Sequence, residues 1–289
     1  MNAILSRLRM YWALTKSLQT GLLLVTGLVG YFSARCPWHS NELVLALGVT
    51  LFLAIAGSTV LNMVWDRDID AKMLRACQRP LPAGRISVRE ATVLGSVMVL
   101  LGIGGAWWLH PLYGALVLAG SFFDVVMYTM WLKRRTPWSI VWGGIAGAMP
   151  ILAGRALGTG QVDAIGILLA LAILFWIPTH ILTFGIKYAD QYRAAGVPIF
   201  PNTYGEWLTR VMVGLSTALA VVAMLVAAWQ IRLPWNYFHL ALWLGGALVG
   251  TAVWSAVRQS PTLNFVLYKF ASLYMLAAMI LIMLGVLEF

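Results

Sequence analysis

Long unbroken apolar runs constrain this chain more than any other feature. One of them contains GILLALAILFW, residues 166–176. A helix needs about 20 apolar residues to cross a bilayer, whereas the strands of a membrane barrel show alternating segments of about ten residues. Runs of helical length occur at 18–34, 41–64, 90–109, 112–132, 138–158, 163–186, 207–230, 236–257 and 263–287. The sequence therefore predicts an all-α polytopic membrane protein with about nine transmembrane helices.

Composition supports this prediction. Hydrophobic residues make up 61% of the 289 residues and charged residues 10%, against roughly 45–50% and about 25% in a soluble globular domain. The spans leave little chain for a separate soluble unit, so we expect a single membrane domain over residues 1–289. The glycine-rich stretch 143–158 predicts close helix packing within it.

The positions of the basic residues predict an orientation. If the N-terminus is cytoplasmic, only Arg35, Arg155 and Arg232 of the 20 Lys and Arg residues lie on the outer side, as the positive-inside rule requires. The long polar segments 62–89 and 187–206 then face the cytoplasm, and we expect the catalytic loops there. The net charge of +10 does not indicate nucleic-acid binding, because the basic residues are scattered between apolar runs.

The first charged segment, NMVWDRDIDAKMLRACQRPLPAGR, spans residues 62–85. Asn62, Asp66 and Asp70 follow one another at four-residue intervals, so a helix through them places all three on one face. Such groups inside a membrane protein are by default a functional site. Oxygen ligands of this kind suit Mg²⁺ bound together with a phosphorylated substrate. The alternative is that these residues only solvate a loop.

Basic residues accompany this acidic face. Lys72, Arg75 and Arg79 follow it directly, and Lys133 and Arg134 form a further basic pair after the fourth apolar run. We expect these side chains to bind a diphosphate group. For Lys133 and Arg134, a role in setting the membrane topology is an equally open interpretation.

A second polar segment follows the sixth apolar run. It contains Lys187, Asp190, Tyr192 and Arg193, which we expect to bind the same substrate, with Asp190 as a further magnesium ligand and catalytic residue alongside Asn62, Asp66 and Asp70. His180 lies about two turns earlier, inside the membrane. A lone histidine there is either a hydrogen-bonded core residue or a substrate contact.

These motifs resemble a known family. NMVWDRDID is similar to the Asn-x-x-x-Asp-x-x-x-Asp signature of UbiA-type intramembrane prenyltransferases. The segments RPLPAGRIS, YTMWLKRRTP, GGIAGAMPILAG, WIPTH and DQYRAAGVPIFP resemble the branch of protoheme IX farnesyltransferases, or heme O synthases. The resemblance covers roughly residues 15–210, and its specificity comes from the order and spacing of the motifs.

The resemblance implies a helical bundle whose cavity opens to the cytoplasm and to lipid. It also implies transfer of farnesyl from farnesyl diphosphate to the 2-vinyl group of heme B, with Mg²⁺ as cofactor and a heme A synthase or terminal oxidase as downstream partner. His180 matches a histidine of this branch, and Asp190 matches the second magnesium motif. Gln191 and Ala194 depart from a full second Asp-x-x-x-Asp, which leaves the number of magnesium ions open.

Two alternatives remain at this point. The same fold transfers prenyl groups to other acceptors, such as a quinone precursor, a chlorin or a lipid. A cation-coupled transporter is the alternative from another class, although its acidic groups belong near the midplane at broken helices, whereas these lie beside clustered arginines at helix ends.

Overall fold

The computed structural model describes residues 2–35 and 40–288, and helices are the only regular elements among them. In chain order these are α1 (Asn2–Leu14), α2 (Ser17–Phe32), α3 (Asn41–Ala71), α4 (Val88–Leu109), α5 (Pro111–Ser121), the π-helix η1 (Phe122–Leu132), α6 (Ser139–Thr159), α7 (Ala164–Lys187), α8 (Ala189–Ala194), α9 (Phe200–Tyr204), α10 (Glu206–Gln230), α11 (Trp235–Arg258) and α12 (Pro261–Leu287).

The described part of the chain contains eight helical segments long and apolar enough to cross a membrane, with η1 continuing α5 as one of them. The 16-residue α2 is a further apolar helix. The predicted all-α membrane protein with about nine spans is therefore confirmed. One difference is local: the run expected at 112–132 is an α-helix only as far as Ser121, and then widens into η1.

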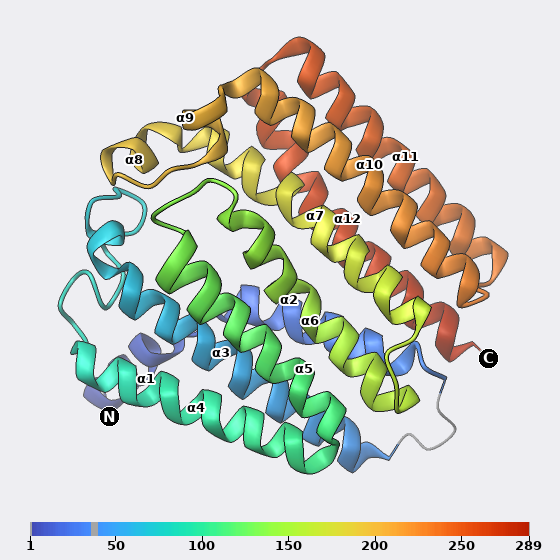
Figure 1. Cartoon of the computed structure of the whole chain (residues 1–289), viewed down its shortest axis with the longest axis horizontal. Coiled ribbons are helices and arrows are strands. Elements are labelled where there is room, and N and C mark those ends of the chain that lie inside the picture. The colour runs from blue at the N-terminus through green and yellow to red at the C-terminus, as the bar shows by residue number, and fades with distance from the viewer. Residues whose placement is uncertain (1, 36–39, 289) are drawn as a thin grey trace.

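The helices form a bundle with an inner and an outer group (Figure 1). α2, α3, α5 with η1, α6, α7 and α12 surround a cavity. α4 packs outside α3 and α5, α10 outside α7, and α11 against α10 and α12. Residues 72–87, 133–138 and 188–205 connect helices at one end of the bundle, which we call the charged end (Figure 1).

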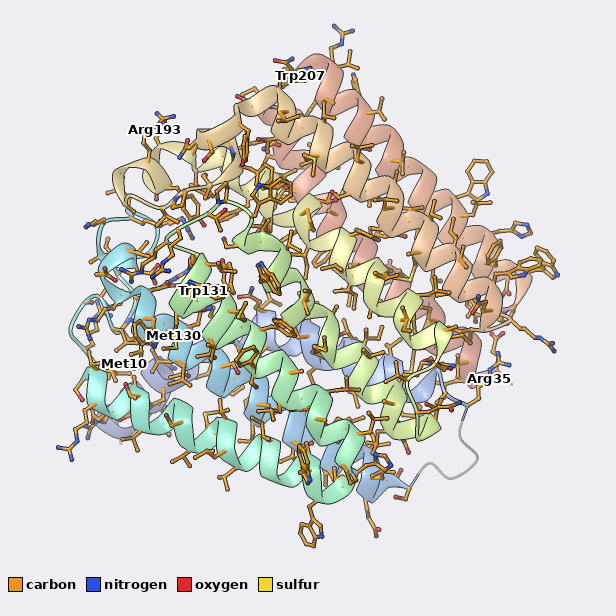
Figure 2. All side chains as sticks on the ribbon, viewed as in Figure 1. Met10, Arg35, Met130, Trp131, Arg193 and Trp207 are labelled. Carbon is orange, nitrogen blue, oxygen red and sulfur yellow. The ribbon has the colours of Figure 1, made fainter. Side chains whose placement is uncertain are left out.

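Large side chains cover the outside of the bundle. Trp131 and Trp207, which Figure 2 labels, are 47% and 63% exposed near the charged end. Trp108 is 91% exposed at the opposite end of the bundle. Tryptophan is enriched at membrane interfaces, where its ring meets both lipid and water. These positions fit the two interfaces of a polytopic integral membrane protein.

α3 is the longest helix and runs past the expected end of its span. Its 31 residues measure about 46 Å at 1.5 Å per residue, whereas the hydrocarbon core is about 30 Å thick. The helix therefore carries Asn62, Asp66 and Asp70 on one continuous face, as the four-residue spacing predicted, with the last two at the charged end.

The backbones of α2 and α6 touch. A β-carbon added to Gly154 would lie 1.9 Å from the carbonyl oxygen of Gly27, and one added to Gly30 would lie 2.1 Å from that of Ile151. Small residues are what permit such contact between membrane helices, so the expected close packing of the glycine-rich segment is confirmed. Among the described residues, the cavity lining stops at Thr26 of α2 and Ala153 of α6, because this contact closes the space beyond them.

An ion pair between buried Arg155 and half-buried Asp163 joins three elements at the end opposite the charged end. The Arg155 guanidinium donates to both carboxylate oxygens of Asp163, each at 2.7 Å, and to the carbonyl oxygen of Ser33 at 2.7 Å. Asp163 also accepts from the backbone N–H of Gly166 and so begins α7. The hydrogen bonds from Arg155 lower the pKa of Asp163, which keeps the carboxylate charged.

We predict that Arg155→Ala destabilises the protein strongly. The variant removes the ion pair and the two hydrogen bonds from buried Arg155 to Ser33, and hydrogen bonds of charged groups contribute about 1.5–3 kcal/mol each. The measurement is the thermal unfolding midpoint in detergent, with Arg258→Ala as the control at an exposed arginine that ends α11. Equal midpoints for the two variants would contradict the structural role of Arg155.

Candidate active site

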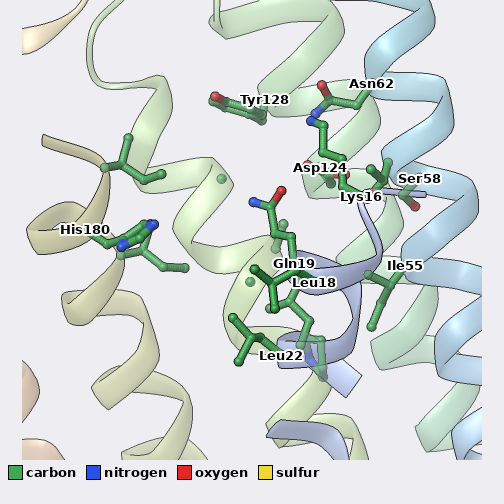
Figure 3. Close-up of a pocket in the computed structure, with 18 of the residues that line it drawn as sticks. Lys16, Leu18, Gln19, Leu22, Ile55, Ser58, Asn62, Asp124, Tyr128 and His180 are labelled. Atoms are coloured by element: carbon green, nitrogen blue, oxygen red, sulfur yellow. The ribbon is translucent and has the colours of Figure 1, made fainter. Parts of the chain in front are cut away.

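A cavity of about 820 Å³ lies inside the bundle and reaches residues at its charged end. Figure 3 shows Lys16, Asn62 and Asp124 on one side of it and His180 on the other. Volumes of 300–1,000 Å³ are typical of ligand sites. Most of its lining is apolar, and its Asp, Lys and Arg side chains are gathered at α3, η1 and the turns that follow α1, α3 and η1.

Asp66 and Asp70 form the acidic part of the cavity, and each is 5% exposed. The Lys133 ammonium donates to Oδ2 of Asp66, and Nη1 of Arg79 donates to Oδ2 of Asp70 at 2.6 Å. Oδ1 of Asp66 is buried and accepts no hydrogen bond from the described residues. A carboxylate oxygen left in this way is available to a cation.

The π-helix adds two further cavity residues, Asp124 and Tyr128. Its hydrogen bonds join residues five apart, such as the 2.8 Å bond from the Lys133 N–H to the Tyr128 carbonyl oxygen. The wide turn therefore brings residues 124, 128 and 133 to the same side. Asn62 lies beside the Asp124 carboxyl group (Figure 3). Single π turns are common at functional sites.

Lys16 lies between α1 and α2 and points into the same region (Figure 3). Its backbone has φ 44° and ψ 56°, in the left-handed region, which turns the chain from α1 into the bundle. Burial, and then the like charges of Arg79 and Lys133, lower its pKa to about 8. Burial also opposes the charge of Lys133, but Tyr128 and Asp66 outweigh it and raise the pKa of Lys133.

Arg75 connects the turn after α3 to α7 and α8. Its Nη2 donates to the Tyr192 hydroxyl oxygen at 3.0 Å. Its guanidinium carbon lies 4.8 Å from the ring centroid of Phe184 and 5.4 Å from that of Tyr188. Its Nε is buried and has no hydrogen-bond partner among the described residues. The aromatic rings fix Arg75 at the cavity while one of its donors stays available.

Aromatic side chains from α7 and α12 form the opposite wall. His180 lies between Trp176 and Tyr268, with ring centroids 5.2 and 4.6 Å away and planes within 27° of parallel. Phe265 continues the series at 6.1 Å from Tyr268 and 11° from parallel. We call these four residues the ring stack. Nδ1 of His180 hydrogen-bonds to the Ser272 hydroxyl at 3.0 Å.

Two predicted substrate-binding residues near α3 lie outside the cavity. Nη1 and Nη2 of Arg134 donate to the Asp68 carboxylate at 2.8 and 2.7 Å, in an exposed pair. Hydrogen bonding by Asp68 raises the pKa of Arg134. Lys72 is exposed where α3 ends. Neither side chain lines the cavity.

In the second polar segment, Tyr192 lines the cavity, whereas Lys187, Asp190 and Arg193 do not. Asp190 is 94% exposed and pairs with Arg193 at 3.1 Å on the outside of α8, and Figure 2 shows Arg193 projecting from the bundle. The ammonium of Lys187 lies 3.6 Å from the ring centroid of Phe265. The structure therefore does not bring Asp190 to Asp66 and Asp70, because α8 turns its side chain outward.

The cavity thus collects part of the predicted site. The residues that line it are Asn62, Asp66, Asp70, Arg75, Arg79, Lys133, His180 and Tyr192, whereas Lys72, Arg134, Lys187, Asp190 and Arg193 do not. No group of three or more His, Cys, Asp or Glu side chains capable of holding a metal occurs among the described residues.

Sequence reasoning missed Lys16 and Asp124 as members of this site. Asp124 carried a usable signal, since an ionisable residue within an apolar run is a functional candidate by default. Lys16 counted only among the basic residues that predicted the membrane orientation.

The sequence has clear relatives. A family model described as the UbiA prenyltransferase family matches residues 23–285. Protoheme IX farnesyltransferase of Archaeoglobus fulgidus is 35% identical over 286 residues, 98% of this chain and 99% of that protein. Protoheme IX farnesyltransferase of Thermofilum pendens is 43% identical over 214 residues, 74% of each chain.

Solved structures share the fold. A structure described as digeranylgeranylglyceryl phosphate synthase has a TM-score of 0.82 at 18% identity, covering 98% of this chain and 100% of that one. A UbiA homolog from Archaeoglobus fulgidus bound to GPP and Mg²⁺ has a TM-score of 0.70 at 17% identity, covering 94% and 99%. From its sequence and its fold, the chain belongs to the UbiA prenyltransferase family.

Proposed function

We propose that the protein is a heme O synthase, which transfers a farnesyl group from farnesyl diphosphate to the 2-vinyl group of heme B. The observation that carries the proposal is the division of the cavity between a charged part at α3 and an aromatic wall at α7 and α12. One part suits a metal diphosphate and the other a flat apolar acceptor. The similarity to protoheme IX farnesyltransferases over nearly the whole chain supports this choice of substrates.

Mg²⁺ fits the residues at α3. The free Oδ1 of Asp66, the Asp70 carboxylate and the Asn62 amide oxygen are the hard oxygen donors that Mg²⁺ prefers. Mg²⁺ commonly takes one or two carboxylates, with substrate phosphates and water completing its coordination, so a third protein carboxylate is not required. When bound, the ion supplies Lewis-acid stabilisation of the charge that develops on the leaving diphosphate. The fold shared with a homolog bound to GPP and Mg²⁺ supports the assignment.

Basic residues of the chain complete the diphosphate site. Arg75, Arg79 and Lys133 line the cavity beside the carboxylates, and Lys16 approaches from the turn after α1. Oriented cations of this kind stabilise a leaving group most strongly where water is excluded. Asp190, Arg193, Arg134 and Lys72 would have to change position to take part.

The other walls position the acceptor and exclude water. Trp176, His180 and Tyr268 stack face to face, so the edges of their rings offer a flat macrocycle an apolar wall. Ser272 holds Nδ1 of His180, which leaves Nε2 for the acceptor. An allylic cation survives only where bulk water is kept away, and the acceptor vinyl group must already be close. Diphosphate leaves first, and the terminal carbon of the vinyl group bonds the allylic cation. Water then adds to the cation left on the inner vinyl carbon and loses a proton, which gives the hydroxyethylfarnesyl side chain.

We further propose that the charged end faces the cytoplasm of a bacterial or archaeal cell. Of the 20 Lys and Arg residues, only Arg35, Arg155 and Arg232 lie toward the opposite end, which the positive-inside rule favours. The segments 62–89 and 187–206 of a single prenyltransferase domain then contact cytoplasmic substrates, and lipid surrounds the bundle. A heme A synthase or a terminal oxidase is the expected recipient of the product.

The deciding experiment combines the purified protein in lipid with heme B, farnesyl diphosphate and Mg²⁺. We expect a farnesylated, hydrated heme by chromatography and mass spectrometry, and its loss on addition of a chelator. If heme stays unchanged while another acceptor is prenylated, the acceptor assignment is wrong and the family assignment stands. Transport is disfavoured because Asp66 and Asp70 lie at a helix end beside arginines rather than on a cation path.

We predict that Asp66→Ala and Asp70→Ala each lower turnover at least about a hundredfold, because each removes a ligand and leaves a cation without its partner. Asp68→Ala is the matched control, since Asp68 lies on the same helix but pairs with Arg134 outside the cavity. Asp66→Asn and Asp70→Asn separate chemistry from folding, because they keep the side-chain volume. Turnover like that of Asp68→Ala in both alanine variants would refute the assignment.

We predict that Arg75→Lys weakens the binding of farnesyl diphosphate, because Arg75 is held at the cavity by aromatic rings. Lysine keeps the charge but lacks the planar fork that bonds Tyr192 and stacks on Phe184. We expect roughly a tenfold rise in KM for farnesyl diphosphate with little change in the unfolding midpoint. The control is Arg67→Lys, at an exposed arginine of α3. Equal KM values for the two variants would exclude Arg75 from the diphosphate site.

A further inference from the structure

Two lysines converge on one ring at the end of the ring stack. The ammonium of Lys187 lies 3.6 Å from the centroid of Phe265, and that of Lys269 lies 4.7 Å from the same centroid. Lys187 ends α7, and Lys269 lies two turns into α12. Neither ammonium forms an ion pair or a hydrogen bond with any residue that the structure describes.

This arrangement differs from that of the cations that line the cavity. Lys133 and Arg79 are already paired with Asp66 and Asp70, and Lys187 lies outside the cavity lining that these carboxylates share. Lys187 and Lys269 are both exposed, as is usual for lysines near the end of a membrane helix. Here two like charges share one small region, which an anionic group would stabilise.

The ring stack connects this pair to the acceptor side of the cavity. His180, Trp176 and Tyr268 line the cavity, and Phe265 stacks on Tyr268 one turn closer to the charged end. A flat ligand that lies along His180 and Tyr268 therefore has its outer edge beside Lys187 and Lys269. Its inner edge faces α3 and η1, across the cavity in Figure 3.

We propose that Lys187 and Lys269 bind the two carboxylates of the acceptor and thereby set which edge of the macrocycle faces the diphosphate. The inference rests on the proposed function, because it takes a protoporphyrin as the acceptor. The propionates of protoporphyrin IX lie on the edge of the ring away from its vinyl groups. Anchoring them at the polar end of α7 and α12 avoids burying two carboxylates and directs a vinyl edge toward Asp66 and Asp70.

The assignment changes the role expected for Lys187. From the sequence we expected Lys187 to bind the diphosphate. Its position over Phe265 assigns it instead to the carboxylates of the acceptor. Lys269 has no equivalent among the sequence predictions. Loss of either lysine should weaken binding of the diacid acceptor and leave binding of farnesyl diphosphate unchanged.

The test compares heme B with its dimethyl ester, which keeps the ring and the vinyl groups but loses both negative charges. Binding is followed by absorbance titration of the full chain in nanodiscs of zwitterionic lipid. We expect wild type to bind the diacid about tenfold more tightly than the diester. Lys187→Gln and Lys269→Gln should each reduce this preference roughly threefold, and the double variant should abolish it without changing diester affinity.

The matched control is the double variant Arg89→Gln and Arg258→Gln. It also removes two exposed positive charges, from α4, which packs against neither α7 nor α12, and from the end of α11, which packs against α12 but not α7. This control should keep the full preference for the diacid. Unfolding midpoints of all variants show that the fold is retained.

The outcomes separate this inference from the proposed function. If the Lys187 and Lys269 double variant keeps the preference, or loses farnesyl diphosphate affinity to the same extent as heme affinity, the carboxylate site is refuted. If wild type binds and farnesylates heme B but does not distinguish it from the diester, only this inference fails. If wild type binds neither porphyrin, the proposed function fails with it.

Discussion

Asp66 and Asp70 are almost fully buried near the end of a long apolar helix, and a buried charge without compensation is unstable by several kcal/mol. Compensation comes from cations outside α3 itself, one close to it in the sequence and one distant. Lys133 arrives at the end of η1, and Arg79 returns from the turn after α3. The paths of these two segments, and with them the shape of the charged end, follow from the need to neutralise two carboxylates.

The rest of the cavity is formed by the helices that pack around Asp66, Asp70 and their basic partners. Contact between α2 and α6 at Gly27, Gly30 and Gly154 ends the space on one side. α7 and α12 supply the aromatic wall on another side, where His180 is held between rings and by Ser272. A cation site and a flat apolar surface then face each other across one cavity, an arrangement suited to joining an ionised donor to a planar acceptor.

Much of this could be predicted from the sequence because the signals are local. Apolar runs of helical length predicted the membrane bundle, and the four-residue spacing of Asn62, Asp66 and Asp70 predicted their shared face. Other features were not local. The π-helix that aligns Asp124, Tyr128 and Lys133 has no composition of its own, and the outward orientation of Asp190 depends on how α8 lies against the bundle.

The sequence by itself determined the class of fold, the family and the acidic face, since hydrophobicity and helical periodicity act over neighbouring residues. Only the tertiary structure decided which basic side chain pairs with which carboxylate. Lys133 and Arg134 are adjacent in the chain, yet one enters the cavity to pair with Asp66 and the other pairs with Asp68 outside. Lys187 and Lys269 are 82 residues apart and meet over Phe265. Electrostatic partners depend on distance in space, which packing sets.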